Sequence, residues 1–325
     1  MRMEFVINRQ RTAERPATGG TTPVGLPTPK YTVNFKEGGR YSHYCIDGQK
    51  VRRVTTILGR FPDSKDGLIK WYAQRVAQTA ASRLKDRTRP HPATGRMFCY
   101  FPADEIGALC QQALDNPEEI KKETADAGTA VHEYVEEWLT AGATEQARQE
   151  ILAKYCLPPE ANSLELIQMQ AETAHMTDSE RNLFYDKMRS FMFFKFCVFW
   201  TRAKLEFFAS EIMVGSRQFM YGGRIDILAK DTAGKLILLD FKTSKYVTPS
   251  YFSQVAAYKM AFEEMYGLDI SRTAIIQCPR EFTDKNMGFG VYEFKPRPYE
   301  EIFKFLVRNW DLCDFTAANC RKETL

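Results

Sequence analysis

Residues 221–245 read YGGRIDILAKDTAGKLILLDFKTSK, and this stretch decides the fold. It contains two runs of apolar residues, one around Asp226 and one ending in Asp240-Phe241, with Asp231-Thr-Ala-Gly-Lys235 between them. Such runs predict two central strands, here 221–230 and 235–242, that are buried on both faces. Gly234 suits the left-handed residue of a three-residue hairpin loop. The stretch therefore predicts an antiparallel strand pair in the middle of a sheet.

The length of the loop sets the register of this pair. It places Asp226 directly opposite Asp240, and Lys242 lies on the same face as Asp240 because side chains alternate along a strand. Two carboxylates facing each other about 5 Å apart repel, and buried they require a cation or a shared proton. A divalent metal ion such as Mg²⁺ or Mn²⁺ meets that need. A structural salt bridge from Lys242 or Arg224 meets it equally well, so the strand pair alone leaves both open.

Outward from the hairpin the pattern predicts an α/β protein. Thr248 and Pro249 predict the start of a helix that ends near Gly267. Thr177-Asp-Ser-Glu180 is a capping box that predicts a long buried helix to about residue 204. Further predicted elements are strands at 41–46, 51–58, 210–219, 273–277 and 288–294 and helices from about 67, at 127–139 and at 299–315. This order predicts a mixed sheet flanked by helices, with a mostly helical lobe placed before it.

The chain is expected to divide into three parts. Residues 1–30 are rich in Pro, Gly and Thr and predict a flexible segment. Residues 31–206 carry the first strands and the helical lobe, and residues 207–325 carry the core. We expect residues 31–325 to form one compact unit.

The charge is unevenly distributed along the chain. The net charge of +4 names no partner, but residues 1–100 carry 19 basic and 7 acidic side chains, whereas residues 101–180 carry 4 and 17. Within residues 60–100, nine Lys and Arg accompany three Asp and several aromatic residues, among them Trp71 and Arg75. Basic side chains with interleaved aromatics suit single-stranded DNA. A solvated surface over core aromatics explains the segment equally well.

The eight cysteines include no CxxC pair, which argues against a zinc ribbon or a thioredoxin-type motif and indicates reduced thiols inside a cell. No apolar run is long enough to span a bilayer, and the first 20 residues lack an apolar signal core. We therefore expect an intracellular protein that does not associate with membranes.

Five short motifs follow one another between about residues 40 and 295. They are Val54-Thr-Thr-Ile-Leu58 with Trp71, Gly128-Thr-Ala-Val-His132-Glu133, Gly223-Arg-Ile-Asp226, Leu239-Asp240-Phe241-Lys242-Thr243-Ser244 and Gln254-Val-Ala-Ala-Tyr258. In this order they resemble the PD-(D/E)XK nucleases of the RecB-like branch. The first is similar to the N-terminal segment of phage-encoded exonucleases and of the mitochondrial genome maintenance exonuclease. Each motif alone is weak, and the ordered set carries the resemblance.

The resemblance implies a restriction-endonuclease-like core and a role for each motif residue. One or two Mg²⁺ or Mn²⁺ ions would be bound by His132, Asp226, Asp240 and the backbone carbonyl of Phe241. Lys242 would orient or activate the attacking water, and Glu211 matches a recurrent acidic position among the catalytic residues. Contacts to DNA are expected from Gln254, Tyr258, Thr243, Ser244, Thr55, Thr56, Trp71 and Arg75.

Two of these assignments have plain structural alternatives. His132 and Glu136 lie four residues apart on a predicted helix, which fits a surface ion pair. Gln254 and Tyr258 have the same spacing, which fits simple packing, or support of the metal ligands in place of a DNA contact. Within the ordered motifs we favour the functional interpretation of His132, and of Gln254 with Tyr258.

The expected activity is that of a metal-dependent deoxyribonuclease, an exonuclease that acts on DNA ends with a preference for single strands in recombination, repair or replication. The alternative is a non-catalytic DNA-binding or scaffolding protein on a nuclease fold, which the intact Asp226, Asp240 and Lys242 disfavour. The late cysteines Cys278, Cys313 and Cys320 lack the close spacing of an iron–sulfur site and argue against a cluster. The resemblance favours the cytoplasm of a bacterial host, for a phage or bacterial protein, over the mitochondrial matrix.

Overall fold

The computed structural model describes residues 25–37, 42–59, 73, 76–78, 80–82, 84–85, 87–99, 105–159, 162–173, 176–279 and 289–310. Within them lies an eight-stranded sheet with the neighbour order β1–β2–β3–β7–β8–β9–β10, in which β6 also pairs with β7. Its strands are β1 (Val33–Lys36), β2 (His43–Ile46), β3 (Gln49–Arg53), β6 (Glu206–Ser216), β7 (Tyr221–Lys230), β8 (Leu236–Lys242), β9 (Arg272–Gln277) and β10 (Gly290–Glu293). The β8–β9 and β3–β7 pairs are parallel and the others antiparallel, so the predicted α/β class with a mixed sheet is confirmed.

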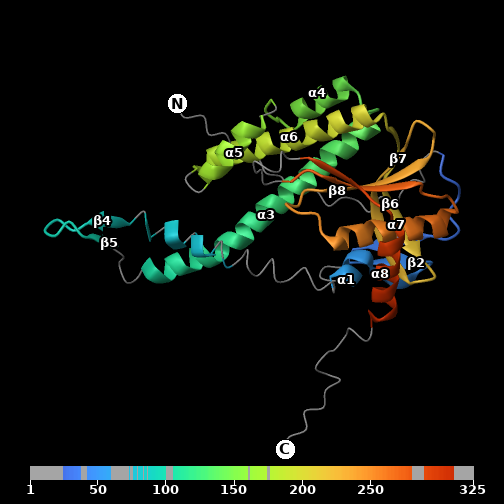
Figure 1. Cartoon of the computed structure of the whole chain (residues 1–325), viewed down its shortest axis with the longest axis horizontal. Helices are drawn as coiled ribbons and strands as arrows, with labels where there is room; N and C mark the ends of the chain where they lie inside the picture. The colour runs from blue at the N-terminus through green and yellow to red at the C-terminus, as the bar shows by residue number, and fades with distance from the viewer. Residues whose placement is uncertain are drawn as a thin grey trace, which may run out of the picture.

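The helices form two groups on opposite sides of the sheet. In Figure 1, α4, α5 and α6 lie with the C-terminal part of α3 on one side, and α1, α7 and α8 lie on the other. The first part of α3 runs away from the sheet toward a separate hairpin of β4 (Thr88–Pro90) and β5 (Met97–Cys99). The helices are α1 (Val54–Leu58), α3 (Glu105–Thr140), α4 (Glu145–Lys154), α5 (Ser163–Glu172), α6 (Asp178–Ala203), α7 (Pro249–Tyr266) and α8 (Arg297–Arg308). The helical lobe expected before the core is thus present.

The two faces of the β7–β8 pair belong to different hydrophobic cores. Ile227, Leu239 and Phe241 pack with aromatic and aliphatic side chains of α3 and α6. Leu228 and Leu238, which alternate with them, pack with side chains of α7 and α8. The pair is buried on both faces, as its apolar runs predict.

The hairpin adopts the predicted register. The ladder joins Ile227 to Leu239 and continues to Lys230 and Leu236. Gly234 has a φ of 73°, the left-handed conformation that the loop requires. The Asp231 amide donates to the Lys235 carbonyl at 3.0 Å, which closes the loop as the sequence indicates.

Several helix ends are confirmed. Thr177 caps α6 with the full capping box, in which Thr177 and Glu180 exchange hydrogen bonds. Helix α7 has Thr248 at its N-cap, Pro249 in its first turn, and Gly267 in the left-handed conformation at its end. Both helices therefore begin where local rules place them.

The predicted strand at 51–58 is wrong beyond Arg53, because Val54–Leu58 forms α1. Val54, Ile57 and Leu58 are buried whereas Thr55 and Thr56 are exposed, which is a helical pattern and not an alternating one. Packing of this stripe against α7 and α8 outweighs the strand preference of its β-branched residues. The predicted helix at 127–139 is also longer, since α3 begins at Glu105.

The remaining expectations on the chain's organisation are only partly covered by the structure. The predicted helix near residue 67, most of segment 1–30 and the part of the last helix after residue 310 lie outside the described residues. The division at residue 206 stays a prediction, although strand β3 from before it pairs with β7 from after it. In the part of the chain that the structure describes, no helix is both long and apolar enough to cross a membrane.

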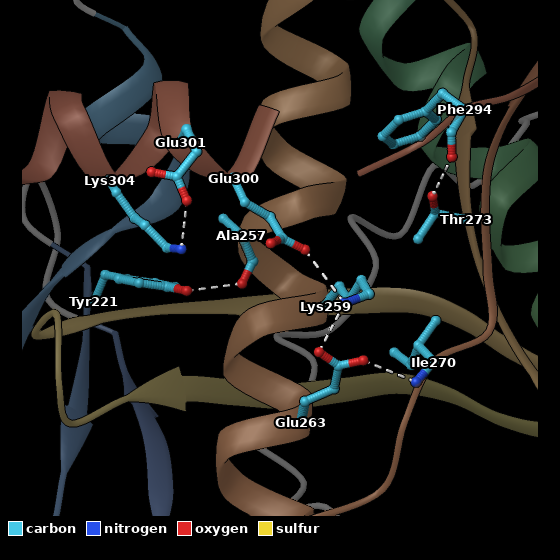
Figure 2. A network of polar contacts seen from close by, with 10 residues as sticks. All are labelled: Tyr221, Ala257, Lys259, Glu263, Ile270, Thr273, Phe294, Glu300, Glu301 and Lys304. Atoms are coloured by element: carbon cyan, nitrogen blue, oxygen red, sulfur yellow. Dashed lines mark hydrogen bonds and ion pairs between the residues drawn. The ribbon is translucent and has the colours of Figure 1, made fainter. Parts of the chain in front are cut away.

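A polar network holds α7 and α8 against the sheet (Figure 2). The Lys259 ammonium lies 2.7 Å from Glu263 and 3.2 Å from Glu300 of α8. The Tyr221 hydroxyl of β7 donates to the Ala257 carbonyl at 2.8 Å. These contacts fix the orientation of α7 over the hairpin that carries Asp226.

Candidate functional site

The pairing of strands β7 and β8 stops at Ile227 and Leu239, and the two strands separate at Asp226 and Asp240. This point of separation, called the fork below, is the centre of the candidate site. The same register extended by one residue sets Asp226 opposite Asp240. Toward the start of β7, strand β3 pairs with Tyr221 and Gly222. Strand β6 occupies one edge of β7 here, so β3 lies on the other edge, where β8 is no longer paired. The Phe241 amide donates to Asp226 Oδ2 at 3.1 Å. A side-chain carboxylate thus accepts a backbone amide bond at the fork.

Asp240 is fully buried, and its Oδ1 has no hydrogen-bond partner among the described residues. The Lys242 ammonium lies 2.6 Å from Asp240 Oδ2, which confirms that the two side chains share a face. Burial raises the pKa of Asp240 to about 7 against the effect of Lys242, and the charge of Asp226 adds to the rise. Burial would lower the pKa of Lys242, but the charges of Asp240 and Asp226 raise it above its ordinary value. Within the described part of the chain, Asp240 therefore lacks part of the polar contact that a buried carboxylate requires.

His132 reaches the fork from α3. Its ring packs edge-on against Phe241, with centroids 4.8 Å apart. Burial lowers the pKa of His132, while the Asp226 charge and a hydrogen bond to the Phe241 backbone oppose that effect. A lowered pKa favours the neutral imidazole, the form that binds metal ions. Predicted ligands from α3, β7 and β8 therefore meet at one place.

A small pocket at this place is lined by both polar and apolar side chains. It is lined by His132, Val135, Glu136, Ser210, Glu211, Asp226, Ile227 and Phe241. The structure therefore brings the predicted residues His132, Glu211, Asp226 and Phe241 together, with the Asp240–Lys242 pair beside them on β8.

Glu211 enters the pocket from an irregular part of β6. The register of β6 with β7 pairs Ser210 with Ile227 and Ile212 with Ile225, so Glu211 lies opposite Asp226. Its φ of 53° lies in the left-handed region, which is strained for a residue with a side chain. The Arg224 Nε atom lies 2.7 Å from Glu211 Oε2. Such strain is often found where a side chain is held for function, and the sequence gives no sign of it.

Glu136 and Ser210 line the pocket but were not predicted as site residues. Glu136 lies one helical turn after His132 on α3, and the Ser210 hydroxyl donates to its Oε1 at 3.4 Å. The signal for Glu136 was its four-residue spacing from His132, which entered the sequence analysis only as a possible surface ion pair. Ser210 had no signal, because its contact joins residues far apart in the chain.

The metal-binding prediction has only partial support in the geometry. Within the described ranges, no three His, Cys, Asp or Glu side chains are close enough together to hold a metal ion. His132 and Asp226 share the pocket, whereas Asp240 forms an ion pair with Lys242. The chemistry of the donors still fits a divalent cation, because they are carboxylates, an imidazole whose pKa is lowered, and an Asp240 Oδ1 that has no hydrogen-bond partner among the described residues.

Gln254 and Tyr258 support the fork from α7. The Gln254 amide donates to the Tyr258 hydroxyl at 2.9 Å, and Tyr258 is only 5% exposed. A Cβ atom on Gly223 would lie 2.3 Å from the Tyr258 ring, which explains the glycine three residues before Asp226. This placement suits the supporting role considered for Tyr258 better than a DNA contact.

The other predicted DNA contacts lie in several places. Thr243 and Ser244 are half-buried in the loop after Lys242, and Thr55 and Thr56 are exposed on α1. Trp71 and Arg75 lie outside the described residues. Their contacts to DNA stay predictions.

Gly128 allows α3 to approach the loop after Lys242, since a Cβ atom there would lie 2.6 Å from Thr243 Oγ1. We expect Gly128→Ala to lower the free energy of unfolding by about 1–3 kcal/mol through overpacking, measured by thermal and urea unfolding. Gly107→Ala is the matched control on the same helix, because no atom of the described residues lies within 4 Å of its Cβ position. It should be neutral or stabilising. Thr243→Ala should suppress most of the Gly128→Ala loss, and full additivity of the two changes would contradict this account.

Comparison with known proteins gives one match that bears on the family. A family model described as the PD-(D/E)XK nuclease superfamily matches residues 106–314, more than half of the chain. No curated protein matches the sequence. The crystal structure of SSO0001 is similar at 9% identity over 57% of this chain and 86% of that chain. Its TM-score of 0.24 is too low to establish a shared fold. The family match includes His132, Asp226, Asp240 and Lys242.

Proposed function

Because the chain belongs to the PD-(D/E)XK nuclease superfamily, we propose that it is a metal-dependent deoxyribonuclease that removes nucleotides from DNA ends and prefers single strands. The observation that carries the proposal is Asp240, which is fully buried, has one ammonium partner and keeps Oδ1 without any among the described residues. A purely structural ion pair would satisfy both oxygens of a buried carboxylate. A carboxylate left short of contacts beside Asp226 suits a group that receives a cation during function.

The residues of the fork have separable roles in phosphodiester hydrolysis. Asp226, Asp240, His132 and the Phe241 carbonyl are the groups that would hold Mg²⁺ or Mn²⁺, which when bound neutralises charge on the phosphate and acidifies a water molecule. Lys242 is kept as an ammonium by its ion pair with Asp240. It can donate hydrogen bonds to the attacking water or to a phosphate oxygen, where negative charge develops in the transition state.

Glu211 and Glu136 line the same pocket from β6 and α3. Their ordinary carboxylate chemistry suits them to accept a hydrogen bond from water and to orient it. His132 and Phe241 hold each other through ring packing and a backbone hydrogen bond, which limits the movement of the Phe241 carbonyl. The motif resemblance supports a place for this activity in recombination, repair or replication in the cytoplasm of a bacterial host.

The direct test is cleavage of end-labelled DNA by the full chain with Mg²⁺, with Mn²⁺ or with a chelator. We expect linear single strands to be shortened from an end with either metal, circular single strands to stay intact, and the chelator to stop the reaction. Cleavage of circles would replace the exonuclease proposal by an endonuclease. Binding without cleavage under every condition would overturn the enzyme proposal in favour of the non-catalytic alternative.

A further inference from the structure

We propose that Tyr246 and Tyr292 form a stacking platform on which the bases of a single DNA strand lie as its backbone enters the fork. This inference rests on the proposed function and deepens it, because it assigns residues to the recognition of a single strand. Neither tyrosine belongs to the motifs that carry the resemblance. Both are among the exposed large side chains of the described residues, at 69% and 41%.

A row of paired residues across three strands joins Lys242 to Gly290, which lies two residues before Tyr292 on β10. The register pairs Lys242 of β8 with Gln277 of β9, and Gln277 with Gly290 of β10. Neighbouring strands lie about 4.8 Å apart, so Gly290 is roughly 10 Å from Lys242 along this row. That span is within the reach of one or two nucleotides. In the sheet order of the described strands β10 stands at the end, beyond β9.

The Tyr292 ring is held against the backbone of its own strand. Tyr292 pairs with Ile275, whose side chain belongs to the core on the α7 side, so Tyr292 lies on that face as well. A Cβ atom on Gly290 would lie 2.8 Å from the Tyr292 ring, which shows that the ring covers this glycine. The Tyr292 hydroxyl donates to Gln277 Oε1 at 3.0 Å. One side of the ring is thus fixed while the residue remains 41% exposed.

The same glutamine fixes the loop that carries Tyr246. The Gln277 amide donates to the carbonyls of Ser244 and Lys245, at 2.8 Å and 2.9 Å. The Ser244 hydroxyl donates to the Tyr246 carbonyl at 2.9 Å. Gln277 is itself buried, so one buried side chain bonds both the Tyr292 hydroxyl and the backbone just before Tyr246, next to the row that contains Lys242.

The chemistry of this surface matches a single strand. Lys245 places its ammonium 5.6 Å from the centroid of the exposed Tyr246 ring, and the Lys242 ammonium lies 5.2 Å from the ring of Tyr251, which is half-buried. Exposed aromatic rings beside cations offer stacking for bases and ion pairing for phosphates. A duplex keeps its bases stacked inside and cannot use such rings. The Tyr292 ring, which is held by its bond to Gln277, also loses little entropy when a base binds.

The test measures binding of a fluorescent twelve-residue oligothymidylate by anisotropy in the presence of a chelator, so that no cleavage occurs. We expect Tyr246→Ala and Tyr292→Ala each to weaken binding about fivefold or more, the loss of one stacked base. Tyr246→Phe is the matched control, because it keeps the ring, and it should stay within about twofold of wild type. Tyr292→Phe keeps the ring but removes its bond to Gln277, so it should weaken binding less than Tyr292→Ala does. Affinity for a blunt duplex of the same length should not change. Photocrosslinks from 5-iododeoxyuridine should map to peptides that contain the two tyrosines.

A second readout separates stacking from damage to the fork. Hydrolysis of bis(p-nitrophenyl) phosphate, which has no base, should be equal in the alanine variants and the wild type. The platform is refuted if the alanine variants bind the oligonucleotide as tightly as wild type. It is also refuted if they lose hydrolysis of bis(p-nitrophenyl) phosphate. In both cases the nuclease proposal stands as long as the wild type cleaves DNA. If the wild type binds without cleaving and the alanine variants lose binding, the platform stands and the nuclease proposal falls. A wild type that does not bind single strands overturns both.

Discussion

Asp240→Asn is expected to reduce DNA cleavage at least about 10²-fold while the protein stays folded. Asparagine has the same shape as aspartate, but it brings no negative charge to a divalent ion or to the charge balance of the fork. Its amide oxygen can still accept a hydrogen bond from the Lys242 ammonium, which now lies 2.6 Å from Asp240 Oδ2. The change removes the desolvation cost of a fully buried carboxylate, and the Lys242 ammonium keeps the Asp226 charge as its nearby counter-charge. The free energy of unfolding should therefore stay within about 2 kcal/mol of wild type.

The measurement is single-turnover cleavage of end-labelled single strands, with oligonucleotide binding in chelator as a second readout. Binding should remain, because the change alters the reaction centre and not the surface that receives the strand. Asp178→Asn is the matched control, since the Asp178 side chain on α6 is 97% exposed and far from the fork in sequence. It should cleave at the wild-type rate. Wild-type cleavage by Asp240→Asn would remove Asp240 from the proposed site.

The hairpin could be predicted because it obeys local rules. The five residues Asp231–Lys235 close a loop of one favoured geometry, with Gly234 as its left-handed residue. Loop closure fixes the register, and the register fixes which side chains meet across the strands. The contact between Asp240 and Lys242 follows from two-residue alternation alone. The capping box at Thr177 is equally local.

The fork itself could not be predicted, because it depends on contacts between distant segments. Strand β3 takes the place of β8 beside Tyr221 and Gly222, and nothing in residues 49–53 indicates this parallel pairing. The left-handed backbone of Glu211 and its position opposite Asp226 arise from the pairing of β6 with β7. For α1, the β-branched residues favoured a strand locally, and tertiary packing of its buried stripe decided otherwise.

Two motif glycines can be found in the sequence, but the reason why each must be glycine cannot be predicted from it. Gly128 and Gly223 are needed because Thr243 and Tyr258 occupy the space in which their Cβ atoms would lie. The sequence shows the glycines, and only the fold shows their neighbours. The two contacts join α3 and α7 to the fork from opposite sides of the sheet.

Lys242→Met is expected to reduce cleavage at least about 10²-fold and also to destabilise the protein. The variant removes the ammonium that can donate to the phosphate or the attacking water. It also leaves Asp240 buried without its cation, which costs on the order of 3 kcal/mol unless the carboxyl group takes up a proton. The double variant Lys242→Met/Asp240→Asn should regain most of that stability, since no buried charge is left, but none of the activity. Chemical unfolding and single-turnover cleavage measure the two effects separately.

Lys259→Met is the matched control for Lys242→Met. The two lysine side chains have nearly the same exposed fraction, but only Lys242 has a proposed role in the reaction. Their side chains are 15% and 17% exposed, and each forms ion pairs with carboxylates. Lys259 holds Glu263 and Glu300 in the network between α7 and α8, so its loss should destabilise the fold while the folded fraction keeps the wild-type rate. If Lys259→Met lost cleavage as severely as Lys242→Met at matched folded fraction, buried charge balance alone would explain both. The proposed role of Lys242 in the chemical step would then have no support, because the loss of a purely structural ion pair would have reduced the cleavage rate by the same factor.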